Sequence, residues 1–160
     1  MKAEPQKEHQ WLQQLLGEWT YEGECPSQGD QPPMKWAGSE SVRSLGGLWT
    51  VAEGRGDAPG EGEHTSILTI GYDPAKKRYS GTFVASMMTH LWIYDGALDA
   101  NGKVLTLDTE GPAMSGDGKM AKYKDIIEIE SNDQRVMRSE MLGDDGKWNE
   151  VMRMNYRRKK

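Results

Sequence analysis

The sequence has little cysteine and no long hydrophobic run. Cys25 is the only cysteine in 160 residues, which excludes an intramolecular disulfide and argues against a thiolate metal site. Mean hydropathy is -0.80, and no apolar run approaches the ~20 residues of a membrane-spanning helix. Residues 1–10 are charged and lack the apolar centre of a secretory signal peptide. We therefore expect a cytoplasmic protein that makes no contact with a membrane.

Basic residues are outnumbered by acidic ones, with Lys+Arg 20 against Asp+Glu 25. The net charge is -5 at pH 7 and the pI is near 5.3, whereas a nucleic acid or an anionic membrane is bound by a basic face. The one basic cluster is residues 157–160, where we expect a solvated chain end. The charge balance argues against a general nucleic-acid binder.

Glycine and polar aromatic residues are plentiful, with Gly 19, Trp 6 and Tyr 6 against Phe 1. A chain of this length fits one domain, residues 1–160. Its hydrophobic fraction of 36% suits short strands joined by turns better than a helical bundle. Residues 5–16 predict a short amphipathic helix, because Trp11, Leu12 and Leu15 share one face and Gly17 follows.

Turn signals divide the rest of the chain into about ten strands. They lie at residues 26–33, 46–47, 56–62, 72–74, 101–102, 111–118, 132–133 and 144–146. Asn101 and Gly102 predict a type I′ hairpin turn, which needs positive φ at both residues. We also expect a break at residues 87–89, although no turn residue marks it, because a single strand across residues 79–98 would be unusually long.

These segments predict an all-β fold, a single antiparallel up-and-down β-barrel of about ten strands over residues 18–157, preceded by the short N-terminal helix. A meander of this length avoids exposed edges by closing on itself. The last strand, residues 147–157, then pairs with the first, residues 18–25. A barrel of this size leaves an interior cavity that a small ligand can fill.

Alternation along each strand selects the side chains that face this cavity. With the apolar face inward, the interior groups are Trp36, Glu40 and Val42; Trp49, Val51 and Glu53; Trp148, Glu150, Met152 and Met154; and His90, Trp92, Tyr94 and Leu98. An unpaired buried carboxylate is costly, so each glutamate is a candidate ligand contact, acid/base group, or metal ligand with His90. The alternative is solvation near strand ends or pairing with Arg43, Arg138 or Arg153, with His90 as an interior hydrogen-bonded residue.

Catalytic and cofactor motifs are absent from the sequence. The glycine-rich residues 54–62 lack the Lys-Ser/Thr and the helix that complete a phosphate loop, so we expect a flexible loop there. Ser86 and Ser139 lack the Gly-x-Ser-x-Gly elbow of a hydrolase, and the three histidines show no metal-ligand spacing. We expect no cofactor and no bound metal.

Residues 15–19, Leu-Leu-Gly-Glu-Trp, are similar to the Gly-x-Trp sequence of lipocalins and fatty-acid-binding proteins, where the Trp packs across the closed end of the barrel. Over nearly its whole length the chain resembles DUF1579, a family of bacterial proteins of unknown function. The resemblance rests on residues 9–12, 17–19, 71–74, 86–92, 110–112 and 146–148, with Ser-Met-Met-Thr-His-Leu-Trp at 86–92 the most distinctive. It implies a lipocalin-like barrel and no particular activity.

Two functions remain open. We favour a binding protein that encloses a small hydrophobic or amphipathic molecule, alone or as a homo-oligomer, over an enzyme. The predicted ligand-binding residues are His90, Trp92, Tyr94, Trp36, Trp49, Met88, Glu40, Glu53 and Glu150. In the alternative, His90 and a buried glutamate perform acid/base chemistry on a bound hydrophobic substrate. If residues 87–89 lie at the open mouth, we expect His90 to select what enters more than to transform it.

Overall fold

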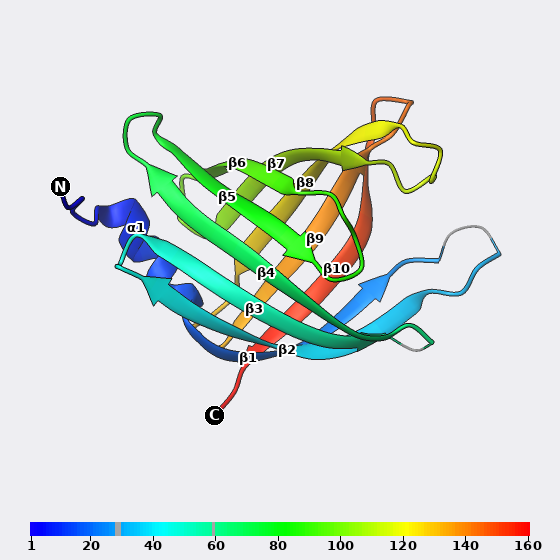
Figure 1. The fold of residues 1–160 in the computed structure, drawn as a ribbon, viewed down its shortest axis with the longest axis horizontal. Coiled ribbons are helices and arrows are strands. Elements are labelled where there is room, and N and C mark those ends of the chain that lie inside the picture. Colours follow the sequence, from blue (N-terminus) through cyan, green and yellow to red (C-terminus); the bar gives the residue numbers. More distant parts are fainter. Residues whose placement is uncertain (28–29, 59) are drawn as a thin grey trace.

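A closed antiparallel barrel forms the body of the protein (Figure 1). The computed structural model describes residues 1–27, 30–58 and 60–160, and ten strands lie in these residues. They are β1 (Gly17–Cys25), β2 (Met34–Leu45), β3 (Trp49–Ala58), β4 (Gly62–Asp73), β5 (Arg78–Ala85), β6 (Trp92–Leu98), β7 (Val104–Pro112), β8 (Met120–Ile129), β9 (Gln134–Leu142) and β10 (Trp148–Arg158). Each strand pairs with the next, and β10 returns to pair with β1, so that Tyr156 lies opposite Tyr21. The predicted barrel and its closure are confirmed.

A short helix covers one end of the barrel (Figure 1). Helix α1 (Lys7–Leu12) continues into the 3-10 turn η1 (Gln13–Leu15), so the helical segment is shorter than the predicted residues 5–16. Its Leu12 is 1% exposed. The His9 ring fixes α1 in place: Nδ1 accepts from the Gln6 amide at 2.9 Å, and Nε2 lies 3.0 Å from the Tyr72 carbonyl oxygen. This end of the barrel is closed.

Trp19 packs inside the closed end. It is 1% exposed and donates through Nε1 to the Leu15 carbonyl at 2.9 Å. The guanidinium groups of Arg135 and Arg158 lie 4.7 and 4.2 Å from its ring centre. Arg158 also donates to the carbonyls of Leu16 and Gln14. The expectation of a merely solvated terminus is therefore wrong for Arg158, which joins β10 to the helical segment.

The strand break predicted at residues 87–89, where the sequence has no turn residue, is confirmed: β5 ends at Ala85 and β6 begins at Trp92. The hairpin between β6 and β7 is also confirmed, but its turn type is not. Gly102 has φ 70, whereas Asn101 does not have positive φ. The Asp99 carboxylate instead organises the loop by accepting from the amides of Lys103 and Val104.

The expected flexible loop at residues 54–62 is wrong for its first half, because β3 continues to Ala58. The inward strand positions here are glycines with a packing role. A Cβ on Gly56 would lie 2.4 Å from the Tyr21 hydroxyl oxygen, and a Cβ on Gly54 would lie 2.7 Å from Ser66 Oγ. Glycine therefore leaves room for neighbouring side chains inside the barrel. Residue 59 of this predicted loop, and residues 28–29 of the one predicted at 26–33, lie outside the described residues.

The end of the barrel opposite α1 carries the loops that join β1 to β2, β3 to β4, β5 to β6, β7 to β8 and β9 to β10 (Figure 1). The largest fully buried side chains lie in the part of the barrel nearest α1, among them Leu12, Ile70, Leu105 and Ile127. No helix in the described ranges is long and apolar enough to cross a membrane. The packed core therefore leaves the opposite end of the barrel interior for a cavity.

Candidate ligand-binding cavity

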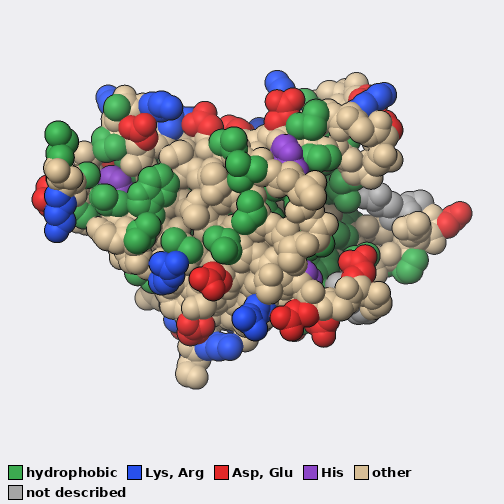
Figure 2. Space-filling model, in the orientation of Figure 1, with side chains coloured by type: hydrophobic (Ala, Val, Ile, Leu, Met, Phe, Trp, Pro, Cys, Tyr) green, Lys and Arg blue, Asp and Glu red, His purple; other side chains and the backbone are tan. Residues whose placement is uncertain are grey.

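A cavity of about 680 Å³ occupies the barrel and opens at the end opposite α1. The face in Figure 2 is hollowed toward its right-hand side, where hydrophobic side chains line the recess. Seven of the ten methionines contribute to the wall: Met34, Met87, Met88, Met114, Met137, Met152 and Met154. Phe83, Trp36 and Trp92 add aromatic surface. Small-molecule sites are typically concave, largely apolar and of this size, and thioether side chains adapt to ligands of different shape.

The floor of the cavity, its end nearest α1, holds a buried ion pair. The side chains of Arg135 and Glu40 are 4% and 10% exposed, and Arg135 Nη2 donates to Glu40 Oε1. The Tyr156 hydroxyl lies 3.5 Å from Glu40 Oε2, and its ring stacks against Arg135 at 3.9 Å. Burial, with the Glu40 charge as a second cause, raises the pKa of Tyr156 well above its usual value. The charge of Glu40 is thus already matched within the protein.

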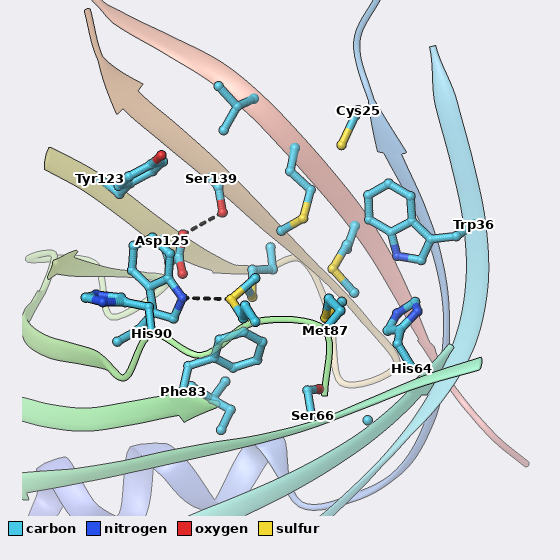
Figure 3. A pocket seen from close by; sticks show the side chains of 18 of the residues that line it. Cys25, Trp36, His64, Ser66, Phe83, Met87, His90, Tyr123, Asp125 and Ser139 are labelled. Atoms are coloured by element: carbon cyan, nitrogen blue, oxygen red, sulfur yellow. Dashed lines mark hydrogen bonds between the residues drawn. The ribbon is translucent and has the colours of Figure 1, made fainter. Parts of the chain in front are cut away.

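A second polar group lies in the wall, on strands β6, β8 and β9. Asp125 of β8 accepts a hydrogen bond from Ser139 of the adjacent β9 (Figure 3). It accepts another from the hydroxyl of Tyr94 of β6, which lies beyond β7. Burial raises the pKa of Asp125, against the opposing effect of these two donors. Burial and the nearby Asp125 charge also raise the pKa of Tyr94 well above its usual value. In Figure 3, Trp36 and His64 lie across the open space from Asp125.

The mouth of the cavity is bordered by the loop between β5 and β6. His90 packs edge-on against Trp92 with ring centroids 4.8 Å apart, and its Nε2 lies 3.0 Å from the Glu110 carbonyl oxygen. Trp92 Nε1 donates to Met88 Sδ at 3.0 Å. Met87 is 59% exposed beside them. These contacts attach the loop to the rim and place His90 at the mouth.

Six of the nine predicted ligand-binding residues line the cavity: His90, Trp92, Tyr94, Trp36, Met88 and Glu40. Trp49 and Glu53 do not, because β3 turns its other face inward. Thr50, Ala52 and Gly54 are buried, whereas Trp49 is 40% exposed and covers Gly71 on the outer surface. The apolar side chains of Trp49 and Val51 suggested the opposite orientation, and that expectation is wrong.

Glu150 also lies outside the cavity, for a different reason. A β-bulge interrupts the pairing of β10 with β9 between Glu150 and Met152, so the strand's alternation shifts by one residue. Val151 and Met152 both line the cavity. Glu150 pairs with Arg153 at 2.7 Å on the outside, which is one of the pairings the sequence left open. The Lys124 ammonium lies over the Trp148 ring, with Nζ 4.4 Å from the ring centre.

Sequence reasoning missed Arg135, Asp125 and Ser139. Asp125 had a usable signal, because Tyr123 and Ile127 flank it at two-residue spacing on an otherwise apolar face. Arg135 had none, since its partner Glu40 lies 95 residues away. The structure forms no hydrogen bond between His90 and Glu40, which lie at the mouth and the floor. Among residues 1–27, 30–58 and 60–160, no group of three or more His, Cys, Asp or Glu side chains is placed to hold a metal ion.

Residues 4–158 match the family described as "Protein of unknown function (DUF1579)". The chain belongs to this family. None of the curated proteins matches the sequence.

Solved structures resemble this DUF1579 member in fold. Rv2717c from M. tuberculosis aligns with a TM-score of 0.69 at 14% identity, covering 98% of this chain and 100% of that chain. The S-type phycobiliprotein lyase CPES from Guillardia theta aligns with a TM-score of 0.63 at 10% identity, covering 95% and 92%. A third barrel, EF1p2_mFAP2b bound to DFHBI, aligns with a TM-score of 0.50 at 12% identity, covering 94% and 98%. At these sequence identities, the similarity shows that the barrel fold is shared and nothing more.

Proposed function

We propose that this DUF1579 protein binds a small, mainly apolar molecule inside its barrel. The observation that carries the proposal is the cavity of about 680 Å³, open at one end and walled by methionine and aromatic side chains. A barrel interior that served only stability would be filled by side chains to near-crystalline density. This one is filled that way only near α1, which leaves a space within the usual range for a small-molecule site.

The residues around the space supply distinct roles. Trp36, Trp92 and the methionines offer apolar contact area, while Tyr94 and Asp125 supply polar groups in the wall. His90 and Met88 lie at the mouth, where they select what enters. One barrel of similar fold is described with the small molecule DFHBI bound, which supports the use of such an interior as a binding site. A lone cysteine that forms no disulfide suits a bacterial cytoplasm as the place of action.

Catalysis by His90 and a buried glutamate is the weaker proposal. Glu40, the buried glutamate of the interior, is ion-paired with Arg135 at the floor, and His90 is bonded at the rim. General acid/base chemistry needs both groups within hydrogen-bond reach of one substrate. Turnover of a bound substrate that disappears in His90→Ala, with the fold retained, would support the enzyme over the binding protein.

Contact quenching of tryptophan emission tests the binding proposal. The probe is 10-bromodecan-1-ol, a neutral molecule whose bromine quenches only the indoles it touches. Of the six tryptophans, Trp36 and Trp92 line the cavity, whereas Trp49 and Trp148 lie on the outer surface. We expect saturable quenching that falls in Trp36→Phe and Trp92→Phe and persists in the matched controls Trp49→Phe and Trp148→Phe. No quenching at saturation, or quenching confined to Trp49 and Trp148, would overturn the proposal.

A further inference from the structure

Asp125 is a carboxyl group of the cavity wall that pairs with no cation among the residues that the structure describes. Its Oδ1 accepts from Ser139 Oγ and its Oδ2 from the hydroxyl of Tyr94, which is 2% exposed. Among the described residues it forms no salt bridge, whereas Glu40 at the floor is paired with Arg135. Of these two carboxylates, the protein pairs Glu40 with a cation and leaves Asp125 without one.

The acidic lining residues outside the Glu40–Arg135 pair carry charge of the same sign as Asp125. The described lining residues include the acids Glu40, Glu61 and Asp125, two histidines, His64 and His90, and neither lysine nor arginine. With Glu40 matched by Arg135, the remaining acidic groups are Asp125 in the wall and Glu61. An anionic ligand group would therefore enter a field of like charge, and a cationic one would be attracted.

Asp125 retains the capacity to accept from a ligand. A carboxylate has about four acceptor positions, and two are used by Ser139 and Tyr94. Burial in the apolar wall disfavours the charged form and raises its pKa. A cationic hydrogen-bond donor at this position would remove that penalty and form a charge-assisted bond. Tyr123 also lines the wall there, and its ring packs edge-on against Trp92 at 5.1 Å, which adds π surface of the kind that attracts ammonium groups.

We propose that the cavity selects amphipathic amines: molecules with an apolar body and a protonated amine whose N–H groups bond to Asp125. This inference rests on the proposed binding function and names its ligand class. The apolar body lies against the methionines and Trp36, and the amine reaches the side of the wall formed by β6, β8 and β9. Ser139 and Tyr94 hold the carboxylate in position for it.

Three probes with one decyl chain test the inference: decylamine, decan-1-ol and decanoic acid, measured by titration calorimetry at pH 7. We expect the wild-type protein to bind decylamine about tenfold or more tightly than decan-1-ol, as for hydrogen bonds to a charged group, and decanoic acid most weakly. In Asp125→Asn, decylamine should bind no more tightly than decan-1-ol. Asp108→Asn is the matched control, because it removes the same charge from the outer face, where Asp108 lies 3.8 Å from Arg78.

The two proposals fail in different ways. If decan-1-ol binds in the cavity but decylamine binds no better, or if decanoic acid binds best, the amine preference is overturned and the binding function stands. A preference that survives in Asp125→Asn also overturns it. If none of the three binds, the binding function itself fails. The wild-type comparison needs no variant, so the inference can be tested even if Asp125→Asn does not fold.

Discussion

Replacing Arg135 with leucine should destabilise the protein severely. Arg135 is 4% exposed, and the substitution leaves the Glu40 carboxylate buried without its cation. Breaking a buried pair from one side costs about 3–5 kcal/mol, and stacking on the rings of Trp19 and Tyr156 is lost as well. A protein of this kind has only about 5–15 kcal/mol of stability in total. The melting temperature should fall by roughly 6–20 °C, at about 2–4 °C per kcal/mol for this chain length.

The double variant Glu40→Leu/Arg135→Leu should recover at least half of that loss, because replacing both charges with apolar groups leaves no unmatched charge. Equilibrium unfolding in urea, followed by circular dichroism, measures the free energy of unfolding of wild type, Arg135→Leu and the double variant. Arg153→Leu is the control, since its pair with Glu150 is exposed and should contribute less than about 1 kcal/mol. A cost of Arg135→Leu no larger than that of Arg153→Leu, or a double variant as unstable as Arg135→Leu, would contradict a structural role for the buried pair.

Three further outcomes are expected. Because the pKa of Asp125 is raised in the fold, this group stabilises the protein fully below its usual pKa of 3.8. That stabilisation declines as pH rises through the folded pKa. The melting temperature of Asp125→Asn relative to wild type should therefore rise between pH 4 and pH 7 in thermal scans, and a constant difference would contradict this. His90→Ala should change the free energy of unfolding by less than about 1 kcal/mol while altering the association rate of decan-1-ol in stopped-flow measurements, and an unchanged rate would remove its role at the mouth. Trp19→Ala should cost about 3–5 kcal/mol in urea unfolding, because the ring is 1% exposed; a cost below about 1 kcal/mol would show that the closed end does not depend on it.

Much of the barrel could be predicted because its turns and alternation are local properties of the sequence. Glycine, proline and asparagine clusters marked most strand ends, and the need to avoid exposed edges brought the last strand to the first. The pairing of β10 with β1 follows from that closure. The conformation of the turn at Asn101 did not follow, because the Asp99 side chain organises that loop.

The cavity wall was harder to predict, since it depends on which face of each strand points inward. Trp92, Tyr94 and Trp36 were placed correctly by simple alternation. The β-bulge after Glu150 shifted the alternation by one residue, and no residue type in the sequence marks it. On β3, the inner face is built from small residues such as Gly54 because neighbouring side chains fill that space, so the bulky Trp49 lies outside.

The partners of buried charges were the least predictable part of the site. Arg135 and Glu40 come from strands far apart in the chain and meet only after the barrel has closed. Asp125 stood in an apolar alternating face, which is a local signal, but its bonds to Tyr94 and Ser139 depend on two other strands, β6 and β9. Cross-barrel contacts of this kind require the strand order and register before they can be assigned.

The most direct test of the central claim is the position of a bound ligand. Crystals grown with 10-bromodecan-1-ol allow the bromine to be located by its anomalous scattering. We expect bromine within the cavity, in contact with side chains such as Trp36, Trp92 or Met137. Bromine found only on the outer surface, for example beside the exposed Ile93, with the cavity free of ligand at saturating concentration, would contradict it.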